Sequence, residues 1–173
     1  MRLITTAVAA AALLSAVVAA NAHDYAVGDL EIGHPWSRAT LPNAPVAGGY
    51  LTITNTGTAA DRLTGGATPA AAAEVQVHEM TMDGDVMKMR QIEGGLEIPA
   101  GETVTLAPGG YHLMLTKPVR RLIEGDRVPL TLRFETAGTV EVELVVDKPN
   151  ARGPEGAGSA GEDHAGHGAM QMK

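Results

Sequence analysis

The sequence predicts an all-β domain, either an antiparallel sandwich or a small Greek-key barrel. Short runs alternate apolar and polar residues with a period of two, and Gly, Pro, Asn and Asp signals interrupt them about every ten residues. No long stretch beyond the N-terminal region has a helical period. Successive strand residues point to opposite faces, so this pattern is typical of sheets that bury one face.

Each predicted strand is an alternating run bounded by turn residues. Turn signals stand at 55–57, 83–84, 108–110 and 124–126. Residues 67–73 are compatible with one short helical turn. The predicted strands are 29–34, 49–55, 74–80, 86–92, 102–106, 111–116, 128–134 and 139–146.

Residues 1–22 are expected to be a signal peptide. Arg2 precedes an alanine-rich apolar stretch, and Ala20-Asn21-Ala22 fits the small-x-small cleavage pattern. Cleavage would leave His23 at the amino terminus of an exported protein. No later segment approaches the ~20 apolar residues of a spanning helix, so no stable membrane insertion is expected. A retained N-terminal anchor is the alternative.

Composition divides the rest of the chain into a β-barrel domain, 23–149, and a tail, 150–173. The tail is rich in Gly and Ala, with one Pro, one Ser and scattered charge. Such a segment buries too little apolar area to offset its ordering entropy, so we expect it to be disordered. The net charge of −7, with no Lys/Arg cluster, argues against nucleic acid as a partner. Cysteine is absent, which excludes disulfides and thiolate metal sites.

The placement of methionine bears most directly on function. Met80, Met82, Met87 and Met89 follow His78, Met114 follows His112, and Met170 and Met172 follow His164 and His167. A chain that used Met only as core filler would scatter it. Thioether and imidazole together form a soft, uncharged ligand set, which favours copper and above all Cu(I). The sequence therefore predicts a copper-binding protein.

Hairpin geometry provides one half of a candidate site. If Asp83-Gly84 is a two-residue loop, His78 lies opposite Met89. Directly opposed residues have Cβ atoms about 5 Å apart, so both side chains can reach one ion. The same register pairs Met80 with Met87, and Glu79 with Lys88 as complementary charges on the other face.

His112-Leu113-Met114 provides the other half. Alternate strand residues share a face, so His112 and Met114 point the same way while Leu113 points to the core. Two such pairs brought together by sheet packing would give a His2Met2 cluster, although the sequence does not show that they meet. Met80, Met82 and Met87 are either further ligands or an apolar collar around the site.

The order of His78, Met89 and His112-x-Met114 resembles the copper-binding pattern of the periplasmic PCuAC copper chaperones. The gap between Met89 and His112 is one residue longer than is usual in that family. The similarity extends over most of 29–146. Further motifs stand in the family's order: Trp36-Ser37-Arg38, Tyr50, Asn55, Pro99-Ala100-Gly101 and the run from Gly109 to Met114.

The resemblance implies a cupredoxin-like barrel in the periplasm that binds one Cu(I) through His78, Met89, His112 and Met114. It also implies delivery of that copper to the copper centres of cytochrome c oxidase, alongside a thiol-bearing assembly factor. The absence of a Cys thiolate argues against blue-copper electron transfer. A non-enzymatic carrier is therefore expected.

Two other functions use the same residue types. A copper buffer would need these ligands but no recipient. An oxygenase would use His23, whose amine and imidazole together can hold Cu(II). Alongside the main site, a second, more adaptable site that can take Cu(II) is expected in the tail, where a flexible His-containing segment can wrap a metal. Its candidate ligands are His164, His167, Met170 and Met172. Incidental tail composition is the alternative.

Overall fold

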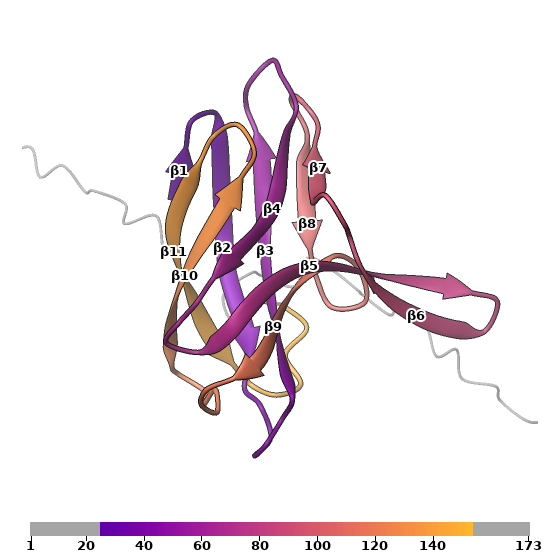
Figure 1. Ribbon diagram of the computed structural model, residues 1–173, viewed down its shortest axis with the longest axis vertical. Helices are drawn as coiled ribbons and strands as arrows, with labels where there is room; N and C mark the ends of the chain where they lie inside the picture. The colour runs from indigo at the N-terminus through magenta and orange to yellow at the C-terminus, as the bar shows by residue number, and fades with distance from the viewer. Residues whose placement is uncertain (1–24, 154–173) are drawn as a thin grey trace, which may run out of the picture.

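The computed structural model describes residues 25–153, and all of the regular structure in them is β (Figure 1). This confirms the all-β prediction. The strands of the described residues are β1 (Tyr25–Val27), β2 (Leu30–Arg38), β3 (Val46–Asn55), β4 (Asp61–Ala67), β5 (Ala72–Asp83), β6 (Val86–Gln91), β7 (Leu96–Ile98), β8 (Thr103–Leu106), β9 (His112–Pro118), β10 (Arg127–Phe134) and β11 (Thr139–Asp147).

Seven of these strands close into a barrel. Their order is β2-β11-β10-β4-β5-β9-β3, and β3 pairs back onto β2. The contact of β11 with β2 is parallel, and the other neighbours are antiparallel. Neighbours that are distant in sequence, such as β5 with β9, give Greek-key rather than up-and-down connections. This crossover places two separate parts of the sequence next to each other.

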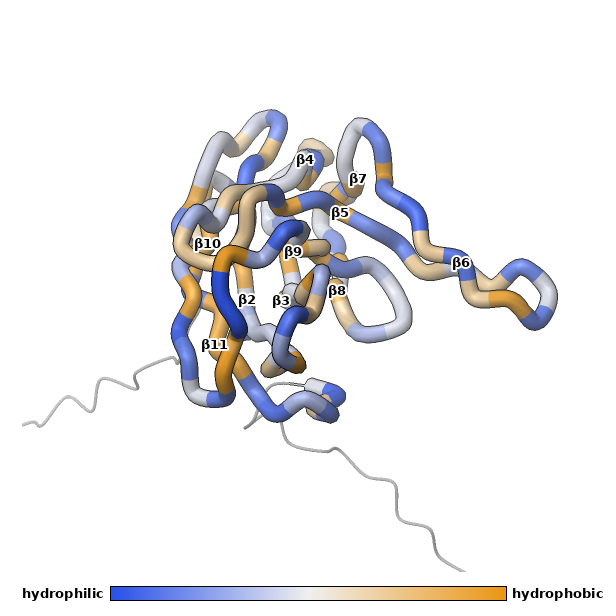
Figure 2. The backbone as a smooth tube through the Cα atoms, turned by 60° about the horizontal axis from the view of Figure 1, so that its bottom comes forward, coloured by the Kyte–Doolittle hydropathy of each residue, from blue (hydrophilic) through white to orange (hydrophobic). Residues whose placement is uncertain are grey.

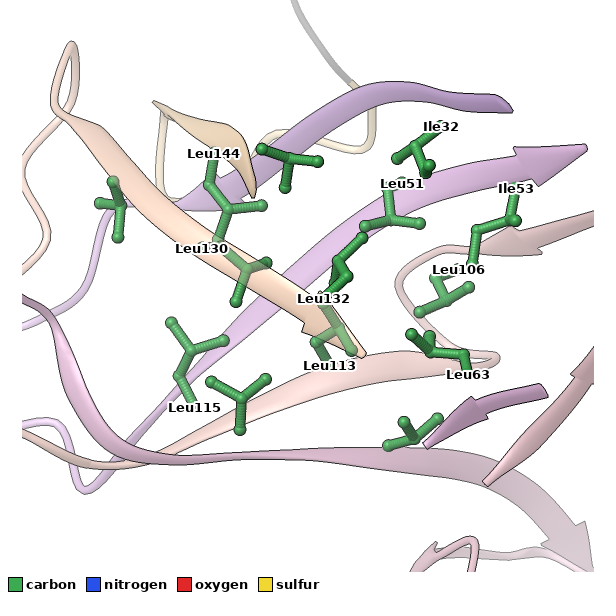
Figure 3. Packing of buried hydrophobic residues seen from close by; sticks show 14 of the residues in the cluster. Ile32, Leu51, Ile53, Leu63, Leu106, Leu113, Leu115, Leu130, Leu132 and Leu144 are labelled. Carbon is green, nitrogen blue, oxygen red and sulfur yellow. The ribbon is translucent and has the colours of Figure 1, made fainter. Parts of the chain in front are cut away.

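The barrel interior is filled by aliphatic side chains, chiefly leucine (Figure 3). Successive strand residues point to opposite faces, so alternate residues enter the interior. In β10, for example, every second residue from Val128 to Phe134 is buried. Leu113 and Leu115 of β9 belong to this core and are almost fully buried. His112 and Met114 therefore point to the outer face of the barrel, as the sequence predicted.

Three strands escape prediction from the sequence. β1 and β7 have three residues each, too short for an alternating pattern to stand out. β4 has Leu63 as its one large apolar residue, and its Gly65-Gly66 pair is typical of a turn. In the barrel a Cβ on Gly66 would lie 2.6 Å from the carbonyl oxygen of Thr131, so the glycine permits the close approach of β10. The segment before β5 makes a single turn, in which the N–H groups of Ala71 and Ala72 both donate to Thr68.

The hairpin of β5 and β6 projects beyond the barrel, as Figures 1 and 2 both show. Its register differs by two residues from the predicted one: Met80 lies opposite Met89, and Met82 opposite Met87. The loop is Gly84-Asp85, between Asp83 and Val86, rather than Asp83-Gly84. Only the first loop residue, Gly84, has a positive φ, of 61°. A glycine there is the mark of a type II′ loop, whereas the predicted loop would need positive φ at both positions.

This correction changes several predicted pairs but not the faces. Because the shift is an even number of residues, His78, Met80 and Met89 still share one face. His78 lies opposite Gln91 instead of Met89, and Glu79 pairs with Arg90 instead of Lys88. Lys88 forms its ion pair with Asp83.

Both ends of the predicted domain organisation lie outside the described residues. This holds for the predicted signal peptide, for His23, and for the tail from residue 154 onward, including His164, His167, Met170 and Met172. The first tail residues are described: the Arg38 Nε donates to the carbonyl oxygen of Ala151 at 2.7 Å. Within residues 25–153 there is no helix long and apolar enough to cross a membrane.

Candidate metal centre

Two histidines from distant parts of the chain face each other on the outer surface of the barrel. His78 of β5 and His112 of β9 are direct register partners. Their ring centroids are 5.8 Å apart, and the ring planes are inclined at 44°. The barrel crossover thus makes neighbours of two residues that the sequence separates.

The carbonyl group of Gly110 orients His112. The Nδ1 of His112 lies 3.0 Å from this oxygen, which can only accept, so Nδ1 carries the proton and Nε2 carries the lone pair. The same carbonyl accepts the backbone N–H of Met80 at 3.2 Å. One loop oxygen therefore fixes the His112 ring and the base of the hairpin together.

Gln76 orients His78 in the same way. The Nε2 of His78 lies 3.0 Å from Oε1 of Gln76, so Nε2 donates the proton and Nδ1 keeps the lone pair. Burial lowers the pKa of His78 below its ordinary value, and the nearby His112 lowers it further. His78 is therefore neutral, as a metal ligand must be, over a wider pH range than a free imidazole.

The two lone-pair nitrogens are buried and have no hydrogen-bond partner. Among the described residues, Nδ1 of His78 and Nε2 of His112 are the only buried side-chain nitrogen or oxygen atoms in this condition. Leaving such an atom unpaired costs about 1–3 kcal/mol, so two of them on facing residues indicate a ligand that binds both. The hydrogen bonds on the opposite ring nitrogens are those that orient metal-binding imidazoles.

Thioethers surround the same position. A cleft of about 190 Å³ is lined by His112, Met114, Met80 and Met89, together with Tyr50. Met114 is 7% exposed, whereas Met89 is 49% exposed, so one sulfur side chain is buried and the other is open to solvent. His78 does not line the cleft itself but lies beside its His112 wall.

Aromatic packing holds Tyr50, which lines the same cleft. Tyr50 stacks on its register partner Trp36 with ring centroids 4.6 Å apart, and the Arg38 guanidinium lies 5.9 Å from the Tyr50 centroid. A Cβ on Gly48 would lie 2.5 Å from the Tyr50 hydroxyl oxygen. Gly48, the register partner of Met114, thus leaves room for the tyrosine ring beside the cleft.

The donors gathered here are two imidazole nitrogens and up to three thioether sulfurs, all uncharged. In residues 25–153 no three His, Asp or Glu side chains group together as a metal site. A soft, neutral donor set suits Cu(I) better than the harder divalent ions, which favour carboxylate and imidazole ligands.

The structure brings the four predicted ligands of the core site to one region. Met89, His112 and Met114 share the cleft, and His78 contacts His112. The second predicted site lies outside the described residues. Sequence reasoning missed Gln76 and Gly110, each of which lies two residues before the histidine that it orients. The same-face spacing of Gln76 and His78 was an available signal, whereas a backbone carbonyl in a loop gives none.

A family model described as "LpqE-like: Putative lipoprotein LpqE-like" matches residues 30–146. The chain is also 34% identical over 117 residues to "Putative lipoprotein Lxx21020" of Leifsonia xyli subsp. xyli. That match covers 68% of this chain and 69% of the relative.

Solved structures with the same fold include copper-bound proteins. The copper-bound PCuAC domain from PmoF2 is 33% identical, with a TM-score of 0.62, over 73% of this chain and 99% of that domain. The solution structure of CuI-DR1885 from Deinococcus radiodurans is 31% identical, with a TM-score of 0.55, over 75% of this chain and 83% of that protein. These similarities confirm the predicted cupredoxin-like barrel. The chain therefore belongs to the LpqE-like family and, with it, to the PCuAC family of copper chaperones.

Proposed function

We propose that this protein is an exported carrier that binds one Cu(I) ion through Nδ1 of His78, Nε2 of His112 and the sulfurs of Met89 and Met114. One observation carries the proposal above all: two buried, unpaired imidazole nitrogens lie on facing residues, beside a cleft lined with thioethers. The copper in the solved relatives agrees with this choice of metal.

The charge of the site supports Cu(I) over divalent copper. Four neutral ligands leave the charge of the ion uncompensated, and the cost of this in a partly buried site rises steeply with charge. Neither Asp nor Glu lines the cleft, whose walls among the described residues are apolar, methionine, tyrosine and histidine. A monovalent ion is therefore the better cargo.

The asymmetry of the ligands supports transport rather than catalysis. His112 and Met114 are buried on the outer face of the barrel, while Met89 lies on a projecting hairpin and remains open to solvent. A recipient can replace the exposed thioether first, so copper can leave by ligand exchange without unfolding the barrel. A recipient with thiolate ligands would win such an exchange, because thiolate is the stronger ligand for Cu(I).

For the cellular role, we extend the proposal to delivery of copper in the periplasm to cytochrome c oxidase, alongside a thiol-bearing assembly factor. The family resemblance supports this role, and the "putative lipoprotein" relatives are consistent with export. The protein would act without catalysing a reaction.

The tail is proposed as an accessory Cu(II) site. Arg38 holds the start of the tail and also lies over Tyr50, which lines the cleft. From Ala151 to His164 the chain can span up to about 45 Å, which is enough to reach the cleft.

Deleting residues 154–173 should then leave the Cu(I) stoichiometry unchanged and remove one Cu(II). Unchanged Cu(II) binding would exclude the accessory site.

A deletion strain of the source organism, grown with limiting copper, distinguishes a delivery function from a buffering function. Delivery predicts reduced cytochrome c oxidase activity, restored by the parent gene but not by His112→Ala or Met114→Leu. Normal oxidase activity together with increased sensitivity to excess copper would contradict delivery and favour a buffer.

A further inference from the structure

The projecting hairpin carries four methionines on one face. They form two cross-strand pairs, Met80 with Met89 and Met82 with Met87. Because the pair that closes a two-residue loop is hydrogen-bonded, these pairs are of the alternate, non-hydrogen-bonded kind, in which side chains lie closest. Successive pairs on one face are about 7 Å apart along the strands. The four thioethers therefore form a short ladder.

This ladder leads from solvent to the copper site. Met82 and Met87, next to the loop, are 63% and 57% exposed, and Met89 is 49% exposed. Met80 is half-buried, and the inner pair lines the cleft with Met114. Sulfur side chains are thus present at each depth, from the tip of the hairpin to the buried end of the cleft.

The other face of the same hairpin is charged. Glu79 pairs with Arg90, and Asp83 pairs with Lys88. Val86 is exposed on this charged face, and elsewhere in the described residues the exposed large aliphatic side chains are Leu41, Val46, Val119 and Ile123. On the hairpin face that adjoins the cleft, the exposed large apolar side chains are all thioethers, those of Met82, Met87 and Met89. Contiguous exposed apolar side chains usually serve a binding function.

We propose that Met82 and Met87 form a second, weaker Cu(I) site in which Met80 or Met89 supplies a third thioether, and that copper passes through it to and from the histidine site. Three neutral thioethers suit Cu(I). In the transfer, a bond from copper to an inner ligand forms as the bond to an outer thioether breaks. Copper remains Cu(I), and no proton is released because thioethers carry none. This inference rests on the proposed function, since the inner site is the destination.

Methionine substitution by leucine tests the site while keeping the apolar shape of the hairpin. The full chain, labelled with ¹³C at the methionine methyl groups, is titrated with Cu(I) without oxygen, in a Met170→Leu/Met172→Leu background that removes the tail thioethers. We expect the first equivalent to shift the Met89 and Met114 signals, and the second to shift those of Met82 and Met87.

The kinetic prediction concerns loading from a Cu(I)–chelator complex. Met82→Leu/Met87→Leu should slow loading of the inner site about tenfold or more while changing its equilibrium affinity little. Val86→Leu, on the other face, is the matched control and should leave both unchanged. If the double variant loads at the parent rate and the second equivalent leaves Met82 and Met87 unshifted, the transit site is excluded and the face is an apolar docking surface.

His112→Ala separates this inference from the proposed function. It should abolish the tight inner site and still permit weak Cu(I)-dependent shifts of Met82 and Met87. Loss of those shifts in His112→Ala would contradict an independent hairpin site. Tight binding that survives His112→Ala would instead contradict the inner site.

Discussion

His78 and His112 face each other across β5 and β9, and each ring is held by a hydrogen bond that leaves one buried nitrogen unpaired. Burial and then the neighbouring His112 lower the pKa of His78, so this ligand favours the neutral state that a cation needs. The barrel therefore presents two oriented lone pairs before any metal arrives, at the expense of two unsatisfied nitrogens.

Removing the hydrogen bond that orients His78 should weaken copper binding without abolishing it. Gln76→Leu leaves all four ligands in place but frees the His78 ring to rotate. We expect the Cu(I) affinity to fall by about 10- to 100-fold with the stoichiometry unchanged, as measured by anaerobic competition with a chelator. Thr81→Val, on the charged face of the hairpin, is the control. An affinity equal to that of the parent would show that Gln76 does not orient the ligand.

Acid should weaken Cu(I) binding in a range set by His78. The pKa of His78 is lowered from its ordinary 6.5, so its proton begins to compete with copper only below that pH. Below the lowered pKa, the affinity should fall by about tenfold per pH unit for each imidazole that must lose a proton. Competition titrations at a series of pH values measure this slope. An affinity that stays constant down to about pH 4 would contradict histidine ligation.

The same shift links pH to the stability of the metal-free protein. Because the folded pKa is below the unfolded one, the unfolded chain binds this proton more readily. The contribution of neutral His78 to stability is therefore complete above pH 6.5 and is lost as the pH falls through the lowered folded value. His78→Gln should make acid unfolding less steep in this range.

The hairpin register has a direct spectroscopic test. Residues that form a non-hydrogen-bonded pair have short Hα–Hα distances, so Met80 with Met89 and Met82 with Met87 should give strong cross-strand NOEs. Strong Hα–Hα NOEs between Thr81 and Val86, and between Glu79 and Lys88, would instead support the loop at Asp83-Gly84 and contradict the register described above.

The buried carboxylate of Asp61 should make the stability of the folded protein sensitive to acid. Asp61 accepts the backbone N–H groups of Arg62, Thr136 and Ala137 at 2.7, 2.9 and 2.8 Å. Burial alone would raise the pKa of Asp61, but these hydrogen bonds outweigh it and lower the pKa. Its stabilising contribution is therefore present above the unfolded pKa of 3.8 and is lost as the pH falls through the lower folded value.

Asp61→Asn should reduce the free energy of unfolding by about 1–3 kcal/mol at neutral pH. The difference from the parent should shrink in acid, where the carboxyl group of the parent is protonated. Urea unfolding at both pH values measures this, with the exposed Glu141→Gln as control. A difference that persists unchanged in acid would mean that the charge of Asp61 does not stabilise the turn of residues 135–138.

The sequence was sufficient for most strands and for the faces that their side chains share, but not for the hairpin register or the long-range pairing. Period-two alternation identified strands such as β10 because Val128 to Phe134 alternate without interruption. β4 was not predicted, because glycines occupy inward-facing positions at which an alternating pattern needs large apolar side chains. The hairpin register was wrong because Gly84 accepts either loop position, and only the backbone conformation decides between them.

Some features of the candidate site could be predicted from the sequence, and others could not. Ligand types and the shared face of His112 and Met114 follow from residue identity and strand period. The contact of His78 with His112 depends on β5 lying beside β9, which alternation cannot specify. The hydrogen bonds of Gln76 to His78 and of the Gly110 carbonyl to His112 are local, and only the bond of that carbonyl to the Met80 N–H joins the two segments.

X-ray absorption spectroscopy at the copper edge of the Cu(I)-loaded protein tests the central claim most directly. It should be recorded for a chain that ends at residue 153, for its His112→Ala variant, and for the exposed-histidine control His34→Asn. We predict two nitrogen and two sulfur ligands in the parent and in His34→Asn, and the loss of one nitrogen or of the bound copper in His112→Ala. A parent spectrum without sulfur ligands, or one that His112→Ala leaves unchanged, would contradict the His2Met2 site.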